Sequence, residues 1–555
     1  MKLSTRKITR FAVGTLAATG LAASAAAADW SSAGRDLNNS RYDASEKQIS
    51  PKTVAGLQLK WTFSSDGDVT ANPVVDGQYL YFPDTAGSLY KVNKLTGALI
   101  WKKPVSGYTG IAGDYARASP AVSGNALIFG NQAGKIGRGA VDSARLVAVN
   151  KDTGALLWMT KVDPGQAMSI LTHSPIVANG LAIIGIASNE ELIAGFVPKT
   201  YWQWNFRGSV VAVDVATGAI KWKSYTVPAG FYGGSVWGST GAVDTKRKLV
   251  YMATGDNFWM PDSVQACAAA AYSHGTSPLD CMPKDNYFDS VIALDLNTGV
   301  IKWGQRGLPY DVWNVGCGLN IPGVFTVPPN DNCPNPKGPD YDFGQGPMLF
   351  SGGESSDDSG DRDDDTDNAK LVGAGQKSGM FWAFNAKSGK LAWVTQAAPE
   401  GLTGGLQWGS ATDGTRIYFA AANSGKAGAG QNPLPWPLKT GGTTTAGGWG
   451  ALDVKTGKTL WTTKDPLGSR AEAAVSGANG VIFGCNLDAT NGMMYAMDAK
   501  SGATLWSFPA GPPTHVNNFY STACVAGPSI SDGMVFWGSG GGQGYGPKKV
   551  FAFGL

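Results

Sequence analysis

The sequence contains few histidines and no cysteine motif for haem or zinc. Only three histidines occur in 555 residues, and none stands in a Ser-His-Asp set or a metal-binding cluster. The six cysteines form no CxxCH motif and no zinc-like CxxC pair. No GxGxxG follows a strand-like segment. These absences argue against a covalent c-type haem on this chain, a cysteine-bound zinc site and a nicotinamide-binding fold.

Charge is also scarce, and long apolar runs are confined to the start of the chain. Charged residues make up 16% of the sequence, and the net charge is +3. This balance indicates neither a nucleic-acid partner nor binding to an acidic membrane surface. After residue 28 no segment is apolar enough to span a membrane, so we expect no transmembrane anchor.

The first 28 residues have the features of a secretory signal peptide. A basic stretch precedes an apolar run, and Ala26, Ala27 and Ala28 supply a cleavage site. The apolar run is shorter than the ~20 residues that a membrane anchor needs. We therefore expect a mature protein, residues 29–555, in the periplasm or secreted. Cysteines fit that oxidising compartment. Among 15 connectivities, proximity favours Cys267–Cys281, Cys317–Cys333 and Cys485–Cys524.

Glycine and tryptophan are abundant, at 76 and 19 residues, and they recur in one motif. The stretch "NKLTGALIW" returns as "NKDTGALLW", "DVATGAIKW", "DLNTGVIKW", "NAKSGKLAW", "DVKTGKTLW" and "DAKSGATLW". In each copy an Asp or Asn starts a tight turn, and Gly supplies a positive φ between two short strands. The seven copies end at Trp101, Trp158, Trp222, Trp303, Trp393, Trp461 and Trp506.

These hairpins predict an all-β, eight-bladed β-propeller in a single domain. An eighth tryptophan, Trp61, lacks the turn before it. The strand "KKVFAFGL" at the C-terminus supplies the missing half, so N- and C-terminal strands share one blade and close the ring. We expect the eight recurring tryptophans to pack between blades and donate their indole N–H groups.

The "AxDxxTGxxxW" copies resemble the tryptophan-docking motif of the quinoprotein alcohol dehydrogenase family. The resemblance extends from "WSSAGRDLNNSRY" to the C-terminus. It implies pyrroloquinoline quinone (PQQ) and a Ca²⁺ ion on the propeller axis. The segments "SNEE", "FRGSVVAVD", "YDVWNVGCG" and "GPDYDFGQGPML" look most like the polyvinyl alcohol dehydrogenase branch.

The resemblance implies a calcium site from two segments. "IGIASNEELIAG" matches at Glu190, with Glu191 next to it, and "YMATGDNFW" matches at Asp256 and Asn257. Calcium prefers oxygen ligands of these types. A hydrated loop carboxylate is the alternative for each.

The resemblance also implies a quinone site. Trp237 in "GGSVWGSTGAVD" matches the tryptophan under the quinone, and Lys377 in "GAGQKSGMFWAFN" matches the cation beside its carbonyl groups. Such a cation would stabilise the developing oxyanion. Arg117, Thr172 and Ser174 match residues that bind the cofactor's carboxylates.

Two departures from the family pattern bear on catalysis. The segment "GIAGDYAR" has no counterpart of the two adjacent cysteines of the methanol-oxidising branch. In "YDVWN", Asn314 replaces the final Asp of the family's Asp-x-Trp-Asp motif, and an amide does not accept a proton as a carboxylate does. Either Asp311 is the catalytic base, or the base lies elsewhere, or the protein is not a dehydrogenase. Asn314 could still orient substrate.

The function implied is oxidation of secondary alcohols, including polyvinyl alcohol. Electrons would pass to a separate, soluble cytochrome c or similar acceptor, since no haem motif is present. The alternative is a non-catalytic propeller that binds or scaffolds partners in the cell envelope.

Two further features have open interpretations. The acidic run Glu354–Asn368 is either a surface calcium loop or a solvated acidic loop. His173, beside the proposed quinone site, either bonds cofactor or substrate or is a structural histidine.

Overall fold

The structure is a computed structural model of the chain. It describes residues 29–134, 144–166, 168–321, 325–351, 371–401, 403–424, 433–488, 491–511, 524–541 and 546–555. The proposed signal peptide and the acidic run 354–368 lie outside the described residues. None of the helices in the described part is long and apolar enough to cross a membrane.

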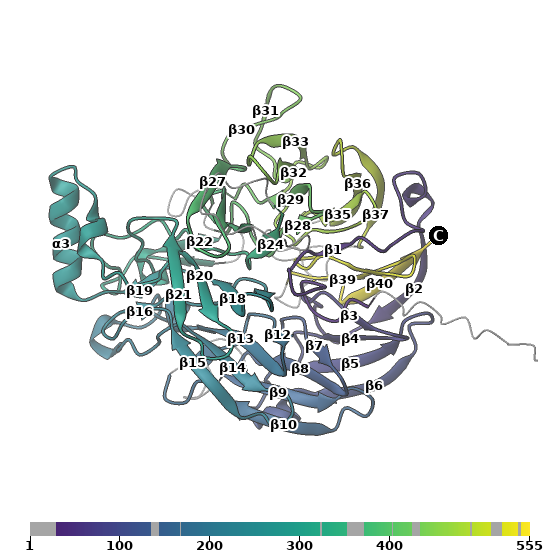
Figure 1. Cartoon of the computed structure of the whole chain (residues 1–555), viewed down its shortest axis with the longest axis horizontal. Coiled ribbons are helices and arrows are strands. Elements are labelled where there is room, and N and C mark those ends of the chain that lie inside the picture. The colour runs from purple at the N-terminus through teal and green to yellow at the C-terminus, as the bar shows by residue number, and fades with distance from the viewer. Residues whose placement is uncertain are drawn as a thin grey trace, which may run out of the picture.

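Eight four-stranded antiparallel blades surround a central axis (Figure 1). In chain order their strands are β3 (Val74–Asp76), β4 (Tyr79–Pro83), β5 (Ser88–Asn93), β6 (Leu99–Pro104); β7 (Ala121–Ser123), β8 (Ala126–Gly130), β9 (Arg145–Asn150), β10 (Leu156–Lys161); β12 (Ile176–Ala178), β13 (Leu181–Ser188), β14 (Ser209–Asp214), β15 (Ile220–Tyr225); β17 (Ala242–Asp244), β18 (Leu249–Ala253), β20 (Ser290–Asp295), β21 (Ile301–Arg306); β24 (Met348–Phe350), β25 (Leu371–Gly375), β26 (Met380–Asn385), β27 (Leu391–Gln396); β28 (Ala411–Thr412), β29 (Arg416–Ala421), β32 (Gly448–Asp453), β33 (Thr459–Lys464); β34 (Ser476–Ala478), β35 (Val481–Cys485), β36 (Met493–Asp498), β37 (Thr504–Pro509); and β38 (Ser529–Ser531), β39 (Met534–Gly538), β40 (Lys549–Gly554), β2 (Gln58–Ser64).

Shorter elements decorate the ring. They are β1 (Tyr42–Asp43), β11 (Ser169–Ile170), β16 (Tyr232–Gly233), β19 (Asn257–Trp259), β22 (Leu319–Ile321), β23 (Phe325–Val327), β30 (Trp436–Pro437), β31 (Thr443–Thr444), the helices α1 (Ser106–Thr109), α2 (Glu190–Ile193) and α3 (Asp262–Ser273), and the 3₁₀ turns η1 (Val54–Gly56), η2 (Lys199–Tyr201), η3 (Pro278–Cys281) and η4 (Val315–Cys317). Figure 1 shows α3 projecting from the rim of the ring.

Burial follows from the stacking of blades on one another. Every residue of β8 is buried, and β9 is buried up to its last residue, because both faces of the middle strands meet a neighbouring blade. The outer strand β10 alternates between exposed and covered positions. Strands buried on both faces are expected to be continuously apolar, whereas an outer strand is amphipathic.

The recurring tryptophans join each blade to the next, as predicted. Each indole N–H donates to a backbone carbonyl of the following blade: those of Lys94, Lys151, Val215, Leu296, Ala386, Val454, Ala499 and Leu57. In the seven blades that carry the motif, the indole ring lies against the turn glycine. A Cβ on Gly299 would stand 2.5 Å from Cε3 of Trp222, so the motif's glycine is required for this contact.

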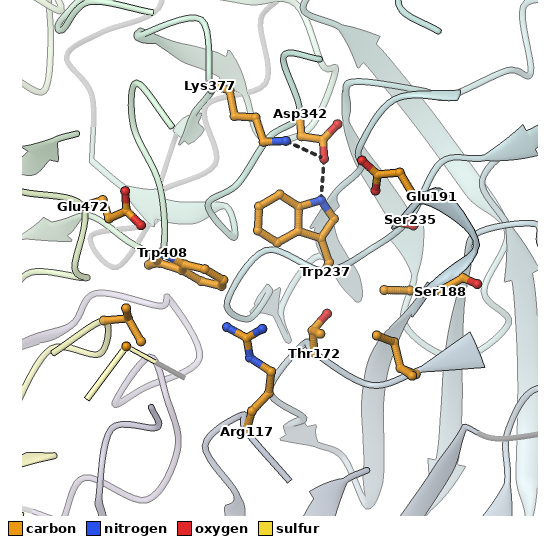
Figure 2. Close-up of a pocket in the computed structure, with 14 residues that line it drawn as sticks. Arg117, Thr172, Ser188, Glu191, Ser235, Trp237, Asp342, Lys377, Trp408 and Glu472 are labelled. Carbon is orange, nitrogen blue, oxygen red and sulfur yellow. Dashed lines mark hydrogen bonds and ion pairs between the residues drawn. The ribbon is translucent and has the colours of Figure 1, made fainter. Parts of the chain in front are cut away.

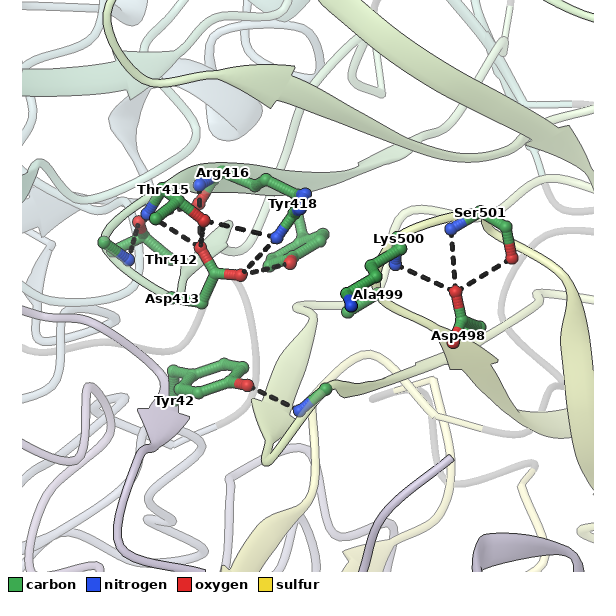
Figure 3. Close-up of polar contacts among 12 residues, drawn as sticks. Tyr42, Thr412, Asp413, Thr415, Arg416, Tyr418, Asp498, Ala499, Lys500 and Ser501 are labelled. Carbon is green, nitrogen blue, oxygen red and sulfur yellow. Dashed lines mark hydrogen bonds and ion pairs between the residues drawn. The ribbon is translucent and has the colours of Figure 1, made fainter. Parts of the chain in front are cut away.

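The turn of the motif also forms as predicted. In the last copy, the carboxylate of Asp498 accepts hydrogen bonds from the backbone N–H groups of Lys500 and Ser501 and from the Ser501 hydroxyl (Figure 3). Gly502 follows at φ 72°. The aspartate therefore closes the turn with its own side chain, and glycine permits the left-handed residue.

The ends of the chain close the ring. Strand β2 pairs antiparallel with β40, with Trp61 opposite Ala552. The indole N–H of Trp506 donates to the carbonyl of Leu57 at 3.1 Å. This bond joins the preceding blade to the blade that both ends of the chain form. The fold predicted from the sequence is confirmed.

Before β2, the N-terminal segment, residues 30–43, runs along the inner strands. Its backbone carbonyls accept hydrogen bonds from residues of six blades: Val75, Val122, Val243, Leu349, Thr412 and Gly477. Tyr42 adds a side-chain contact, because its hydroxyl accepts the N–H of Gly480 (Figure 3). This segment therefore ties the blades together near the axis.

Three disulfides hold the insertions and the last blades. They join Cys267 to Cys281, Cys317 to Cys333, and Cys485 to Cys524. The first two close loops of the β18–β24 region, and the third joins the last two blades. The pairing that proximity favoured is confirmed.

Candidate functional site

A cavity of about 270 Å³ lies where the blades converge (Figure 2). We call it the axial cavity. Its side chains come mainly from the loops that lead into inner strands, so equivalent positions of successive blades meet at one place. They are Arg117 before β7, Thr172 before β12, Trp237 before β17, Asp342 before β24, Trp408 before β28, Glu472 before β34 and Val525 before β38.

Trp237 offers a flat aromatic surface in this cavity. Its indole N–H donates to Asp342 at 2.7 Å, which fixes the plane of the ring. Trp408 meets it edge-on, with ring centroids 5.6 Å apart. Ile111, from the segment without cysteines, belongs to the same apolar cluster as Trp237, together with Ile170. The arrangement suits a planar, polar ring system.

Lys377 places one cation between two buried carboxylates. Its Nζ lies 2.6 Å from Asp340 and 3.4 Å from Asp342, and 5.4 Å from the centroid of Trp237 (Figure 2). Burial alone would lower the pKa of Lys377, but these two carboxylates raise it well above its ordinary value. The lysine therefore stays charged beside the aromatic platform.

Three carboxylates form a group that could hold a metal ion. One oxygen each from Glu191, Asp256 and Asp340 lies within 4.8 Å of the other two. Both carboxylate oxygens of Asp256 are buried without a hydrogen-bond partner. Burial raises the pKa of Glu191 to about 7, and it raises the pKa values of Asp256 and Asp340 well above their ordinary range. An all-oxygen set with unsatisfied buried carboxylate oxygens fits a hard cation such as Ca²⁺.

The structure separates the two adjacent glutamates. Helix α2 begins at Glu190. The carboxylate of Glu190 accepts hydrogen bonds from the backbone N–H groups of Asn205 and Phe206. Glu191 instead lines the axial cavity. The sequence favoured Glu190 as the metal ligand, whereas the geometry favours Glu191, because a short helix turns successive side chains in different directions.

Asn257 is likewise turned away from the acidic group. Its amide donates to the carbonyl of Tyr232, and its side-chain oxygen accepts from Asn286. Only Asp256 of this predicted pair belongs to the metal-binding group.

Neither Asp311 nor Asn314, the two candidate residues of "YDVWN", lines the axial cavity. The carboxylate of Asp311 accepts the backbone N–H groups of Asp340 at 3.2 Å and Tyr341 at 2.8 Å. Asn314 donates to the carbonyls of Phe258 and Asn332 and accepts from Gly316, which caps η4. Asn314 thus has a structural role as the cap of η4. Asp311 positions the segment that carries Asp340.

Arg117 and Thr172, two of the residues predicted for the cofactor's carboxylates, lie on the opposite side of Trp237 from Lys377 (Figure 2). The guanidinium of Arg117 lies 5.2 Å from the centroid of Trp408. The hydroxyl of Thr172 is buried without a partner. Ser174 accepts the N–H of Ser119 at 3.0 Å and lines a second, smaller cavity rather than the axial one. The predicted set is brought together: Arg117 and Thr172 line both cavities, and Ser174 lines the second one.

His173 is buried between blades and does not line the axial cavity. Its Nδ1 accepts the N–H of Gly185 at 3.4 Å. Burial lowers its pKa to about 3, so it is neutral near pH 7. The structural interpretation of this histidine is the one that its contacts support.

The sequence did not identify Asp340, Asp342 and Trp408 as site residues, although Asp340 and Asp342 stand in "GPDYDFGQGPML", one of the segments that carry the family resemblance. The available signal was position: Asp342 stands in a loop leading to an inner strand, as Trp237 does. About thirty residues of chain separate Asp340 from Asp311, so the sequence does not show that the Asp340 N–H donates to Asp311.

Residues 30–330, more than half of the chain, match the PQQ family described as the glucose/ethanol/alcohol dehydrogenase β-propeller domain. The chain belongs to this quinoprotein family. Residues 440–546 match a second repeat family, described as outer membrane protein assembly factor BamB. A polyvinylalcohol dehydrogenase of Sphingopyxis sp. (strain 113P3) is 28% identical over 93% of this chain and 73% of its own. One from Pseudomonas sp is 26% identical over 92% and 73%.

Solved quinoprotein structures share the fold. The quinohemoprotein alcohol dehydrogenase of Comamonas testosteroni superposes with a TM-score of 0.64 at 19% identity, over 95% of this chain and 80% of that one. A europium-containing methanol dehydrogenase gives 0.63 at 16% identity, over 95% and 98%. At these identities the likeness concerns the propeller architecture alone.

Proposed function

We propose that this protein is a PQQ-dependent dehydrogenase that oxidises secondary alcohols, including the repeating units of polyvinyl alcohol. The observation that carries the proposal is Lys377, held between Asp340 and Asp342 against the face of Trp237. The cation lies beside an aromatic surface and next to the carboxylates that could hold a metal ion. This arrangement suits the binding and reduction of a quinone. The relatives named polyvinylalcohol dehydrogenase support the substrate class.

The side chains in and next to the axial cavity divide the binding of cofactor and metal. Trp237 supplies the surface on which a planar ring stacks. Arg117 and Thr172 offer donors to carboxylate groups. Glu191, Asp256 and Asp340 supply the metal ligands, with Ca²⁺ as the ion that their chemistry favours. When bound, PQQ takes up the two electrons and two protons that an alcohol loses on becoming a carbonyl compound.

The proton of the substrate's hydroxyl goes to Asp342, a carboxylate that can act as a general base. Asp342 lines the axial cavity and lies 3.4 Å from Nζ of Lys377. Asp340 contacts the same ammonium group at 2.6 Å, and in this scheme it is a metal ligand. We assign the base to Asp342 instead of Asp311, because Asp311 holds two backbone N–H groups and lies outside the cavity lining.

Lys377 has two roles in this scheme. It keeps its charge in a buried site, where a fixed positive group stabilises negative charge developing on an oxygen. It also orients both aspartates through direct contacts. Periplasmic location and a separate cytochrome c as electron acceptor complete the proposal, and the signal-like first 28 residues support the location.

The test reconstitutes the purified full chain with PQQ and Ca²⁺. Reduction of an artificial electron acceptor is followed with polyvinyl alcohol, a small secondary alcohol and a primary alcohol. We expect turnover with the first two, dependence on both PQQ and Ca²⁺, and loss of turnover in Asp340→Asn or Asp342→Asn. Quinone binding that is seen by absorbance but gives no turnover with any alcohol would overturn the proposed reaction.

The match of residues 440–546 to the BamB repeat favours a second candidate, a non-catalytic envelope propeller. Such a protein has no use for a lysine buried among carboxylates. Failure to bind PQQ in the same titration would therefore support this second candidate.

A further inference from the structure

A second cavity, of about 40 Å³, lies next to the axial cavity. We call it the arginine cavity. Arg117, Thr172 and Trp408 line both cavities, and the arginine cavity adds Arg41 and Asn72. Arg41 comes from the N-terminal segment that runs along the inner strands. Two guanidinium groups from distant parts of the chain therefore face one small space.

Arg41 is buried without an anionic partner. It is 1% exposed, and its Nε has no hydrogen-bond partner. Its side-chain hydrogen bond to Asn72 is long, 3.4 Å from Nη1 to Oδ1. Among the described residues that line the arginine cavity, none is an aspartate or glutamate. Burial lowers the pKa of Arg41 to about 10, so the group remains charged near pH 7. An unpaired buried charge is costly.

The backbone holds Arg41 in this place. The residue has φ 49°, its N–H donates to Gly34, and its carbonyl accepts from Gly477 in the inner strand β34. Gly409 packs against the guanidinium, and a Cβ there would stand 2.6 Å from Nε. Glycine at this position leaves room for the guanidinium, and the backbone contacts of Arg41 build the charge into the fold.

We propose that the arginine cavity binds a small monovalent anion between Arg41 and Arg117. The cavity's 40 Å³ exceeds the ~10–15 Å³ needed to admit one water-sized group, which leaves room for a halide ion or one carboxylate group. The unpartnered hydroxyl of Thr172 and that of Ser174 provide further donors. The anion is either a free inorganic ion or a carboxylate of the cofactor in the adjoining axial cavity.

The experiment uses the full chain purified without quinone. Crystals soaked in sodium bromide are measured at the bromine absorption edge, and an anomalous peak within hydrogen-bond reach of Arg41 Nε is expected. In solution, sodium chloride is compared with sodium gluconate, whose anion is too large for the cavity, at equal ionic strength. We expect a saturable rise of the unfolding midpoint of about 1–3 °C with chloride.

Variants locate this effect. Arg41→Met should abolish the chloride-dependent rise. Arg306→Met is the control, because Arg306 is partly buried but bonds the carbonyls of Asn286 and Pro283, away from the arginine cavity. The control should keep the rise. If Arg41→Met does not fold, the bromide map of the unmodified protein decides alone.

Addition of PQQ distinguishes the two sources. Loss of the bromide peak on quinone binding assigns the cavity to a cofactor carboxylate, and its retention assigns a free anion; both support an anion site. The proposal is overturned if the map shows no bromide and chloride and gluconate give equal midpoints. Because the bromide and chloride measurements need no quinone, they stand apart from the proposed enzymatic activity.

Discussion

Adjacent glutamates show how one residue position decides a metal site. Glu190 and Glu191 have the same side chain and neighbouring backbones, yet only Glu191 faces the axial cavity. Glu190 accepts two backbone N–H groups from residues 205 and 206. One carboxylate is therefore satisfied by the chain itself, and the other is the one that we propose as a metal ligand.

The pair provides a matched test of the calcium site. We expect Glu191→Gln to weaken Ca²⁺ binding by at least about tenfold, since it removes one anionic ligand. Glu190→Gln should leave the affinity within about threefold. Isothermal titration of the quinone-free protein measures both. Equal weakening by the two variants would contradict the assignment of Glu191.

Lys377 supports a second prediction at the same scale. Lys377→Met removes the only cation in contact with Asp340 and Asp342 among the described residues. We expect kcat to fall about 10²–10³-fold, the usual effect of losing one electrostatic stabiliser.

The control for this variant is Lys302→Met, because Lys302 contacts Asp295 at 3.5 Å on the exposed part of a blade. It should retain full activity in the reconstituted enzyme. A Lys377→Met enzyme with unchanged kcat and a raised KM would assign the lysine to substrate or cofactor binding alone.

At the scale of elements, the tryptophan-docking turn is the unit that joins blades. Its glycine has two duties: a left-handed backbone and a surface flat enough for the indole. Gly299 has φ 73° and lies against Trp222, whereas Gly77 has φ 56° in a β3–β4 turn with open space around it. A substitution at Gly77 therefore tests backbone strain alone, and one at Gly299 tests backbone strain together with packing against the indole.

Alanine at each position measures the two contributions. We expect Gly77→Ala to lower the free energy of unfolding by about 1 kcal/mol, from the left-handed backbone alone. Gly299→Ala should cost about 1–3 kcal/mol more, because its Cβ would overlap the indole. Urea denaturation compares them. Equal losses would mean that the indole moves aside at no cost.

On the scale of the whole molecule, the ring brings carboxylates from several blades into one buried region. Glu191, Asp256, Asp289, Asp311 and Asp340 all have pKa values raised by burial, to about 7 for Glu191 and Asp311. A raised carboxyl pKa means that the folded state favours the protonated form. Its stabilisation is present below the ordinary pKa and is lost as pH rises through the folded value.

The metal-free protein should therefore lose stability as pH rises from about 4 to above 7. Ca²⁺ should reduce this loss, because the bound ion favours the ionised carboxylates. Thermal unfolding between pH 5 and pH 8, with excess chelator or with Ca²⁺, tests both statements. A midpoint for the chelated protein that rises over this interval would contradict them.

Much of this molecule was determined by the sequence alone. Seven copies of one turn and an eighth tryptophan predicted the number of blades, the indole contacts and the closing of the ring by both ends of the chain. These features depend on contacts within one hairpin or between one hairpin and the next along the chain. The order of the segments in the sequence therefore predicts them. Arg117, Thr172, Trp237 and Lys377 could also be placed at the cavity, from the family resemblance of their segments.

Only the tertiary structure decided the rest of the site. It directed Glu191 instead of Glu190 into the cavity, gave Asn314 a capping role, and brought Asp340 and Asp342 to Lys377. It also buried Arg41 beside Arg117, across 76 residues of chain. Side-chain direction in a short helix and contacts between distant loops depend on how eight blades meet at an axis, and that meeting is set by packing of the whole ring rather than by local sequence.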